Sequence, residues 1–182
     1  MKQGVPKSAD SARDTPENAL TDGRFSREET ITALRRNWRA EAEGAATYRE
    51  LARMERDERR REILNKMAEA EERHAGRWAE RIAALSGHAV TENPADIGPS
   101  SAIILSARVG SIDIALGRIE AVEDEHVRAC TAQLATLDDP ESTQILEELI
   151  QDESSHARGL RAITRPSAEP RSRLDSILRR ER

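Results

Sequence analysis

Apolar residues recur at steps of three and four along four stretches of the chain, at residues 26–54, 58–86, 111–137 and 140–165. This spacing places the apolar side chains on one face of a helix, so each stretch predicts a long helix with one side turned toward a core. Glycine and proline are sparse within these stretches, as helix interiors require. The pattern therefore predicts an all-α fold of the four-helix-bundle type.

Signals for the start and end of helices support these limits. Ser26, followed three residues later by Glu29, is a capping box, in which each side chain accepts a hydrogen bond from the other residue's backbone N–H. Gly87 follows the second stretch as a typical C-terminal cap, and Pro166 ends the fourth because proline cannot continue a helix. We therefore expect one four-helix domain over residues 26–165.

The connections predict how the helices are arranged. A short turn at residues 56–57 joins the first two helices into a hairpin, and a second short turn joins the last two. Residues 88–100 contain prolines and a glycine and predict a long crossover between the hairpins, followed by a short helix at 101–109. Outside the bundle, residues 1–25 are polar and aperiodic, which predicts disorder, and residues 166–182 form a basic tail whose end has the pattern of a short amphipathic helix.

Composition narrows the classes of function. Charged residues make up 35% of the 182 residues and aromatic residues 2%, which suits long helices rather than a sheet. The net charge of −5 argues against nucleic acid as a partner. Cys130 is the single cysteine, which excludes an intramolecular disulfide, a cysteine zinc site and a rubredoxin-type iron centre. No apolar segment suits a signal peptide or a membrane span, so we expect a cytoplasmic protein.

Polar residues interrupt each apolar stripe at its middle. Glutamate is almost never buried unless it is paired, because an isolated carboxylate in a core is costly or takes up a proton. Two divalent cations would balance four such carboxylates, and histidines would add neutral nitrogen ligands. The predicted metal ligands are Glu41, Glu71, His74, Glu123, Glu153 and His156.

The spacing of these residues supports a shared site. Glu41 and Glu71 are 30 residues apart, as are Glu123 and Glu153, and each pair is centred on the turn of its hairpin, so its members lie at the same height. The whole set repeats at an offset of 82 residues, which indicates a duplicated helix pair. One Glu-x-x-His motif alone could be ordinary surface charge, but the repeat matches the arrangement of di-metal carboxylate bundles.

Residues near this set have more than one interpretation. His126, one turn after Glu123, could be a seventh ligand, a partner that orients a carboxylate, or a core histidine bonded to a carbonyl. The position of Tyr48 predicts a hydrogen bond from its hydroxyl to a ligand residue, and a radical role for Tyr48 is the less common alternative. Cys130, at the duplicate position of Tyr48, predicts a small core residue. His88 falls in the crossover and has no predicted role.

Several of these motifs resemble the rubrerythrin-like branch of the ferritin-like superfamily, and especially the erythrin domain of bacterial vacuolar-iron-transporter fusions. The resemblance covers about residues 27–164 and is carried by the segments at 37–41, 48–52, 71–75, 120–123 and 152–158. It implies a site for two iron ions in which Glu71 and Glu153 bridge and the other four ligands are terminal. The ligand set alone would also suit manganese.

Two departures from the family pattern bear on function. Rubrerythrins of the peroxidase type usually carry a glutamate where this chain has His126, and they carry a rubredoxin domain for electron delivery, which one cysteine cannot build. In the transporter fusions, membrane helices begin where this chain has its basic tail. The resemblance therefore leaves a stand-alone erythrin and the soluble part of a longer transporter as alternatives.

Three functions are compatible with these residues. The first is iron handling, in which the site binds Fe(II), oxidises it with dioxygen or peroxide, and stores, senses or passes on the ion. The second is redox catalysis, as a peroxidase or as a di-iron hydroxylase similar to demethoxyubiquinone hydroxylase. The third is a non-enzymatic, iron-dependent module that docks on a membrane transporter through the tail. We expect the first function, because Fe(II) supplies its own electrons and the excess of acidic residues favours the approach of cations. We also expect a homodimer.

Overall fold

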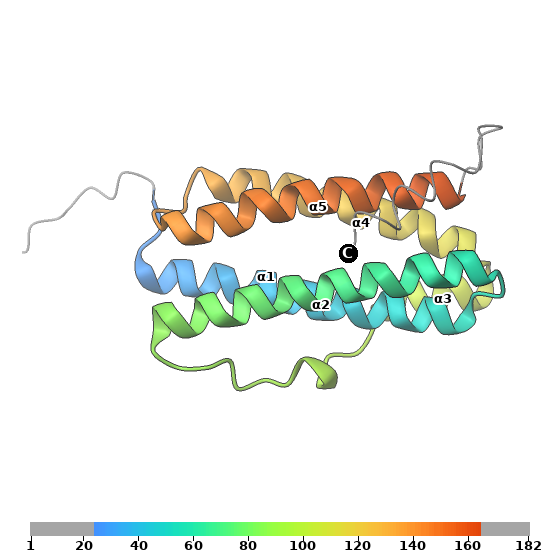
Figure 1. Ribbon diagram of the computed structural model, residues 1–182, viewed down its shortest axis with the longest axis horizontal. Coiled ribbons are helices and arrows are strands. Elements are labelled where there is room, and N and C mark those ends of the chain that lie inside the picture. The colour runs from blue at the N-terminus through green and yellow to red at the C-terminus, as the bar shows by residue number, and fades with distance from the viewer. Residues whose placement is uncertain (1–23, 165–182) are drawn as a thin grey trace, which may run out of the picture.

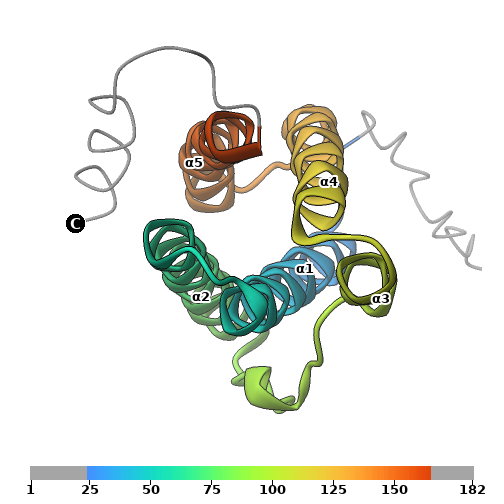
Figure 2. The same cartoon turned by 90° about the vertical axis from the view of Figure 1, so that its right-hand side faces the viewer.

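The computed structural model describes residues 24–164, so the predictions for the N-terminal segment up to residue 23 and for the basic tail lie outside the described residues. The long helices are α1 (Arg27–Met54), α2 (Glu58–Ser86), α4 (Ile112–Leu134) and α5 (Pro140–Thr164), and a 3-10 turn, η1 (Pro94–Asp96), and a short helix, α3 (Ser101–Val109), lie between the hairpins. The two hairpins pack lengthwise against each other (Figure 1). Seen end-on, the long helices form the four corners of a bundle, with α3 beside α1 and α4 (Figure 2). The predicted all-α, ferritin-like bundle is confirmed.

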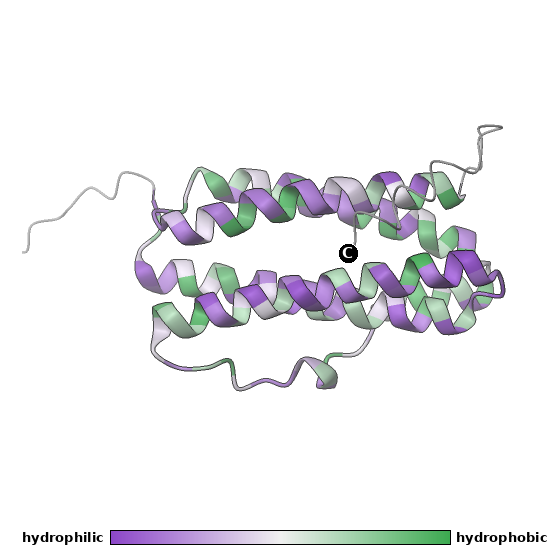
Figure 3. Cartoon of the chain, viewed as in Figure 1, coloured by the Kyte–Doolittle hydropathy of each residue, from purple (hydrophilic) through white to green (hydrophobic). Residues whose placement is uncertain are grey.

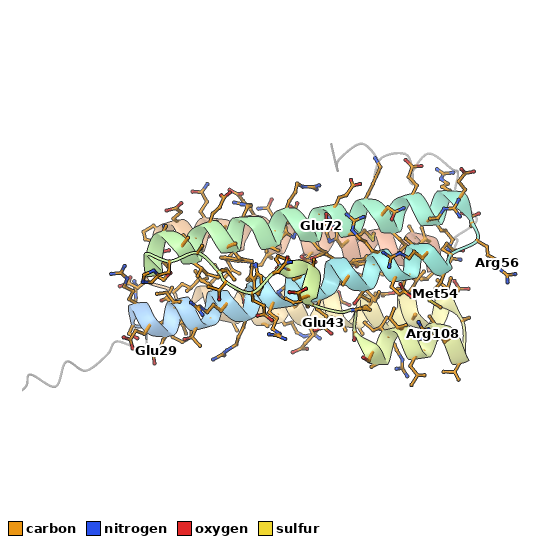
Figure 4. The ribbon with its side chains drawn as sticks, turned by 90° about the horizontal axis from the view of Figure 1, so that it is seen from below. Glu29, Glu43, Met54, Arg56, Glu72 and Arg108 are labelled. Carbon is orange, nitrogen blue, oxygen red and sulfur yellow. The ribbon has the colours of Figure 1, made fainter. Side chains whose placement is uncertain are left out.

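Local sequence signals determine where most helices begin and end. The capping box at Ser26 and Glu29 is formed: the backbone N–H of Ser26 donates to Glu29 Oε2 at 2.8 Å, and that of Glu29 to Ser26 Oγ at 3.3 Å. The side chain of Asp57 accepts a backbone hydrogen bond in the first turn of α2. Gly87 ends α2 with a φ of 76°, a left-handed conformation that glycine adopts without strain. Between the two helices, Arg56 extends away from the protein (Figure 4).

The third long helix is shorter than its apolar stripe predicts. α4 ends at Leu134, whereas the predicted helix continues to residue 137. Leu137 is nevertheless buried, at 6% exposure, because the turn after α4 folds it into the core. The backbone N–H of Phe25 donates to Thr136 O in this turn at 2.7 Å, which ties the start of α1 to it. Because Leu137 is buried although it lies outside α4, the apolar pattern predicted a helix end that is too late in the sequence.

The crossover runs along the outer side of the α1–α2 hairpin, over residues 87–100 (Figure 1). It is held at two points. Arg39 on α1 donates to Glu92 at 2.8 Å, and the backbone N–H of Ser100 donates to Thr47 Oγ1 at 2.9 Å. The crossover runs from one end of the first hairpin to the other, and these contacts hold it in place, so the second hairpin can pack against the first in register.

The apolar core consists of two clusters, one near each end of the bundle. One cluster includes Leu51, Leu64, Leu116 and Leu160, and the other includes Trp38, Trp78, Ile82 and Leu146. Figure 3 shows hydrophilic and hydrophobic residues alternating along every long helix, as amphipathic helices require. On α2, α4 and α5 the predicted ligands lie in sequence between the members of the two clusters, and on α1 Glu41 lies next to Ala42, the last member of the second cluster on that helix. Within residues 24–164, no helix is both long and apolar enough to cross a membrane.

Candidate metal centre

The six predicted ligands converge at the middle of the bundle. Glu41 lies on α1, Glu71 and His74 on α2, Glu123 on α4, and Glu153 and His156 on α5. All six are buried, with at most 6% of any residue exposed. Their ligand atoms form two overlapping groups, and within each group one atom from each residue lies within 4.8 Å of the others. The groups are Glu41, Glu71, His74 and Glu153, and Glu71, Glu123, Glu153 and His156.

The overlap gives the two groups a common pair of carboxylates. Glu71 and Glu153 belong to both, whereas each group has one further glutamate and one histidine of its own. The shared pair comes from α2 and α5, which pack against each other. The arrangement can hold two cations side by side, with each shared carboxylate able to reach both.

Both histidines turn their Nδ1 atoms into this cluster. His74 Nδ1 lies 3.4 Å from Glu153 Oε1 and 3.6 Å from Glu41 Oε2. His156 Nδ1 lies 3.0 Å from Glu71 Oε1 and 3.4 Å from Glu153 Oε2. Two imidazole nitrogens therefore face the carboxylates, in the position that a nitrogen ligand to a shared cation would need.

The carboxylate oxygens have few donors within the protein. Neither oxygen of Glu41 and neither oxygen of Glu153 accepts a hydrogen bond, although all four atoms are buried. Buried polar atoms are nearly always satisfied, so atoms such as these indicate a ligand that the protein side chains do not replace. Carboxylate oxygens with imidazole nitrogens suit iron, manganese and zinc, so the residues present fit a pair of iron ions.

The electrostatics of the cluster follow from burial and crowding. Burial and the negative charge of Glu153 hold the pKa of Glu71 and of Glu123 well above the usual range of a glutamate. Burial would also raise the pKa of Glu153, but the nearby imidazoles of His156 and His74 and the carboxyl group of Glu123 outweigh it and hold that pKa well below its usual range. Some of the carboxyl groups therefore hold protons, which a cation would displace when it binds.

The charge state of His74 follows from the same competition. Burial favours the neutral imidazole, but the hydrogen bond to Asp152 and the nearby carboxylates of Glu153 and Glu41 raise the pKa of His74 to about 12. Its imidazolium charge balances part of the carboxylate charge. A cation at the cluster would take over this role and release the proton, because a histidine ligand must be neutral.

Tyr48 is positioned as its sequence predicts. Its hydroxyl donates a hydrogen bond to Glu123 Oε1 at 2.5 Å, from a side chain that is 1% exposed. Burial and the Glu123 charge hold the pKa of the Tyr48 hydroxyl well above its usual range, so the hydroxyl keeps its proton and remains a donor. The hydrogen bond predicted for Tyr48 is therefore formed, and its acceptor is one of the predicted ligands.

His126 lies at the edge of the cluster. Its Nε2 is 3.8 Å from Glu41 Oε1, which is too long for a hydrogen bond, and its side chain is 19% exposed. It belongs to neither group of four. Cys130 is buried, and burial together with the charges of Glu41 and Glu153 raises its pKa to about 12, so it is a neutral thiol.

Sequence reasoning gave no role to Asp152, which the structure connects to the site. Its Oδ2 lies 3.2 Å from Nε2 of His74, on the side of the ring opposite the cluster. A hydrogen bond there fixes the ring orientation and leaves Nδ1 facing the carboxylates. The available signal was its place immediately before the Glu-x-x-His motif, one residue off the apolar stripe of α5.

Four other acidic residues of the long helices lie on the outer surface. Glu43 and Glu72, both labelled in Figure 4, are exposed, and so are Glu125 and Glu148. Glu72 pairs with Arg49 through two contacts of 2.6 and 2.7 Å, and Glu148 pairs with Arg77 at 2.6 Å. His88 is exposed in the crossover, away from the cluster. Burial thus separates the candidate ligands from the other acids on the same helices.

The buried carboxylate and histidine cluster inside four long helices is the arrangement of the ferritin-like di-metal carboxylate proteins. A sequence profile of the rubrerythrin family matches residues 32–164, and the chain belongs to that family. It is 30% identical over 158 residues to 3-demethoxyubiquinol 3-hydroxylases of Pseudomonas paraeruginosa strain PA7 and Stutzerimonas stutzeri strain A1501, covering 84% of this chain and 74% of each relative. The same enzyme of Pseudomonas savastanoi pv. phaseolicola is 30% identical over 162 residues, with 86% and 75% covered. No solved structure matches the chain.

Proposed function

We propose that the chain binds two iron ions at the buried cluster and oxidises Fe(II) with dioxygen or peroxide. The observation that carries this proposal is the overlap of two four-residue groups through Glu71 and Glu153. One cation needs only one such group. Two groups that share carboxylates suit a pair of ions close together, which can divide a two-electron transfer between them.

Each residue has a role in this proposal. Glu71 and Glu153 would hold both ions, and each remaining glutamate and histidine would hold one ion. When bound as Fe(II), the pair supplies one electron from each ion to the oxidant. The side chains hold the ions, exclude water and release protons: His74 gives up its Nδ1 proton as it becomes a ligand, and the carboxyl groups with raised pKa values give up theirs.

A cavity beside the first hairpin bears on which reactants could reach the cluster. A cavity of about 660 Å³ lies between the α1–α2 hairpin and the crossover, with Ala45, Ala75 and Ile97 among its lining residues. None of the six cluster residues lines it. A hydroxylase must place an organic substrate against its metal pair, whereas Fe(II) and dioxygen are small enough to reach a buried cluster through side-chain motion. The cavity therefore does not supply the substrate site that hydroxylation would need.

Hydroxylation remains the second candidate because of the sequence relatives. The 3-hydroxylation of a demethoxyubiquinol is the activity of proteins that are 30% identical to this chain over most of its length. The two candidate functions differ in the compound that is oxidised. Iron oxidation proceeds with Fe(II) alone, whereas hydroxylation incorporates an oxygen atom into an added quinol.

The test starts with purified full-length protein freed of metal and titrated anaerobically with Fe(II). We expect about two ions per chain and, on mixing with air, ferric absorbance that grows faster than in a protein-free control. His74→Ala and His156→Ala should each weaken iron binding by roughly 10–100-fold, as loss of a ligand or of its partner commonly does. His88→Ala, an exposed histidine, is the matched control and should leave binding unchanged.

Three results would contradict the proposal. Binding of no iron by a folded protein would exclude the metal centre. An equal loss on removing His88 and His156 would show that the wrong histidines were chosen. No Fe(II) oxidation above the control rate, together with oxygen incorporation into an added demethoxyquinol, would establish the hydroxylase instead.

A further inference from the structure

The outer face of α4 differs from the outer faces of the other long helices. Within residues 24–164, every large apolar side chain that is exposed lies on α3 or α4, and these are Leu105, Val109, Ile114 and Val122, each between 52% and 78% exposed. Comparable outer positions of the other helices carry charge, for example Arg35 on α1, Glu80 on α2 and Glu147 on α5. Exposed apolar side chains that gather on one face mark an interaction surface.

The apolar surface continues from α3 to α4, which lie side by side at the edge of the bundle (Figure 2). A Cβ built on Gly110 would lie 2.8 Å from Ile114 Cδ1, so the Ile114 side chain lies against Gly110, the residue that follows Val109. Further along α4, Arg118 Nη1 donates to Ala102 O on α3 at 3.5 Å. The two helices therefore present one surface rather than two separate patches.

Small residues along α4 leave room for another helix. Gly117, Ala121 and Ala129 are all exposed on its outer side. A Cβ built on Gly117 would have no neighbouring atom within 4 Å, so the described part of the chain does not fill the space above it. The distance between two packed helices depends on the side chains at the contact, and small side chains allow a close approach.

The charged residues of this face are placed symmetrically about its centre. Arg118 lies three residues before Ala121, and Glu125 lies three residues after Val122. Both charged residues are exposed, and steps of three and four residues bring them onto the same side of α4 as Ala121. The point between Ala121 and Val122 therefore has a positive charge on one side and a negative charge at the same distance on the other.

Two copies of α4 that cross antiparallel at this point would complement each other. Each residue then faces the residue of the other copy that lies equally far beyond the crossing point, so Arg118 of each copy meets Glu125 of the other. By the same rule Ile114, seven residues before Ala121, meets Ala129, seven residues after Val122. Opposite charges and apolar side chains are thus matched, as a self-complementary two-fold interface requires.

We infer that the outer face of α4 is the interface of a symmetric homodimer, in which two copies of α4 pack antiparallel around Ala121 and Val122. A second copy of the chain accounts for the placement of both charges, whereas a lipid surface or an unrelated protein needs no such symmetry. Glu125 also pairs with Arg128 at 2.7 Å, but both side chains are at least 65% exposed, and exposed pairs of this kind contribute little and can be exchanged. The inference needs no metal, so it is independent of the proposed function.

The first test measures the mass of the full-length protein by sedimentation velocity over a dilution series. We expect a dimer that dissociates on dilution. Val122→Asp places two like charges at the crossing point and should raise the Kd of the dimer by at least about 100-fold, because like charges that face each other cost several kcal/mol. Val122 is 54% exposed, which makes aspartate there compatible with folding, and circular dichroism checks this. Ala40→Asp, at an exposed alanine on α1, is the matched control and should leave the dimer intact.

The second test exchanges the charges. Arg118→Glu alone and Glu125→Arg alone each set like charges against each other and should raise the Kd by at least about tenfold. The double variant, Arg118→Glu with Glu125→Arg, should restore the dimer. This rescue separates an interface from a structural role, because Glu125→Arg cannot replace the contact that Arg118 makes with Ala102 O in its own chain.

Four results would overturn the inference. The first is a monomer at every concentration, and the second is a dimer that Val122→Asp leaves intact. The third is a double variant that stays as weak as the single variants, which would contradict the antiparallel arrangement. The fourth is a monomer that binds phospholipid vesicles and loses this binding in Val122→Asp, which would assign the face to a membrane. Iron stoichiometry, measured separately, tests the proposed function whichever of these results is obtained.

Discussion

Glu41→Leu should make the metal-free protein more stable while it removes a metal ligand. Glu41 is 1% exposed, and neither of its oxygens accepts a hydrogen bond. Leucine has a similar size and no polar atoms, and it would join the apolar side chains on either side along α1. His74 loses one neighbouring carboxylate but keeps Asp152 and Glu153 within 3.4 Å. The substitution therefore removes a costly group whose purpose is to bind a cation.

The expected size follows from the lost cost of burial. A buried polar group without hydrogen-bond partners costs about 1–3 kcal/mol in the free energy of unfolding, and apolar replacement of buried charged groups recovers such costs. For a chain of this length, each kcal/mol shifts the melting temperature by about 2–4 °C, so a rise of roughly 2–12 °C is expected. Iron stoichiometry should fall below that of the unaltered protein.

The assay is thermal unfolding with and without Fe(II) under anaerobic conditions, followed by circular dichroism. Glu43→Leu is the control, since Glu43 is exposed two residues away on the same helix and should change the metal-free melting temperature very little. A fall of several degrees on Glu41→Leu, with full iron binding retained, would refute the reasoning. It would show that Glu41 is structural and that its burial is satisfied within the protein.

Three further predictions concern protons, a buried hydrogen bond and a helix cap. Glu71, Glu123 and His74 have raised pKa values, so their stabilising effect in the metal-free protein is complete below their unfolded pKa values and declines as pH rises. The melting temperature of the metal-free protein should therefore fall above about pH 6.5, whereas the affinity for Fe(II) should rise because fewer protons compete with the metal. A pH series of both measurements checks this. Tyr48→Phe leaves a Glu123 oxygen without its donor and should lower the metal-free stability by about 1–3 kcal/mol in denaturant unfolding; no change would mean that this hydrogen bond carries no energy. Ser26→Ala should cost about 1 kcal/mol by the same method and leave the number of bound ions unaltered, since the cap is remote from the cluster.

The sequence by itself determined the helices and the height of the cluster. Capping residues and helical periodicity act over a few residues, so α1, α2 and α5 begin and end close to where local signals place them. The heights followed from the symmetry of a hairpin, because residues equidistant from a turn lie level with each other. Glu41 and Glu71, and likewise Glu123 and Glu153, therefore reach the same layer whatever the detailed packing.

Tertiary structure alone decided the contacts between side chains on different helices. The end of α4 was misjudged because Leu137 is buried by a turn rather than by a helix, and periodicity cannot distinguish the two. Asp152 lies off the apolar stripe of α5, and only the position of α2 beside it brings it against His74. The distance of His126 from Glu41 depends on how α4 is rotated against α1, which no local pattern encodes.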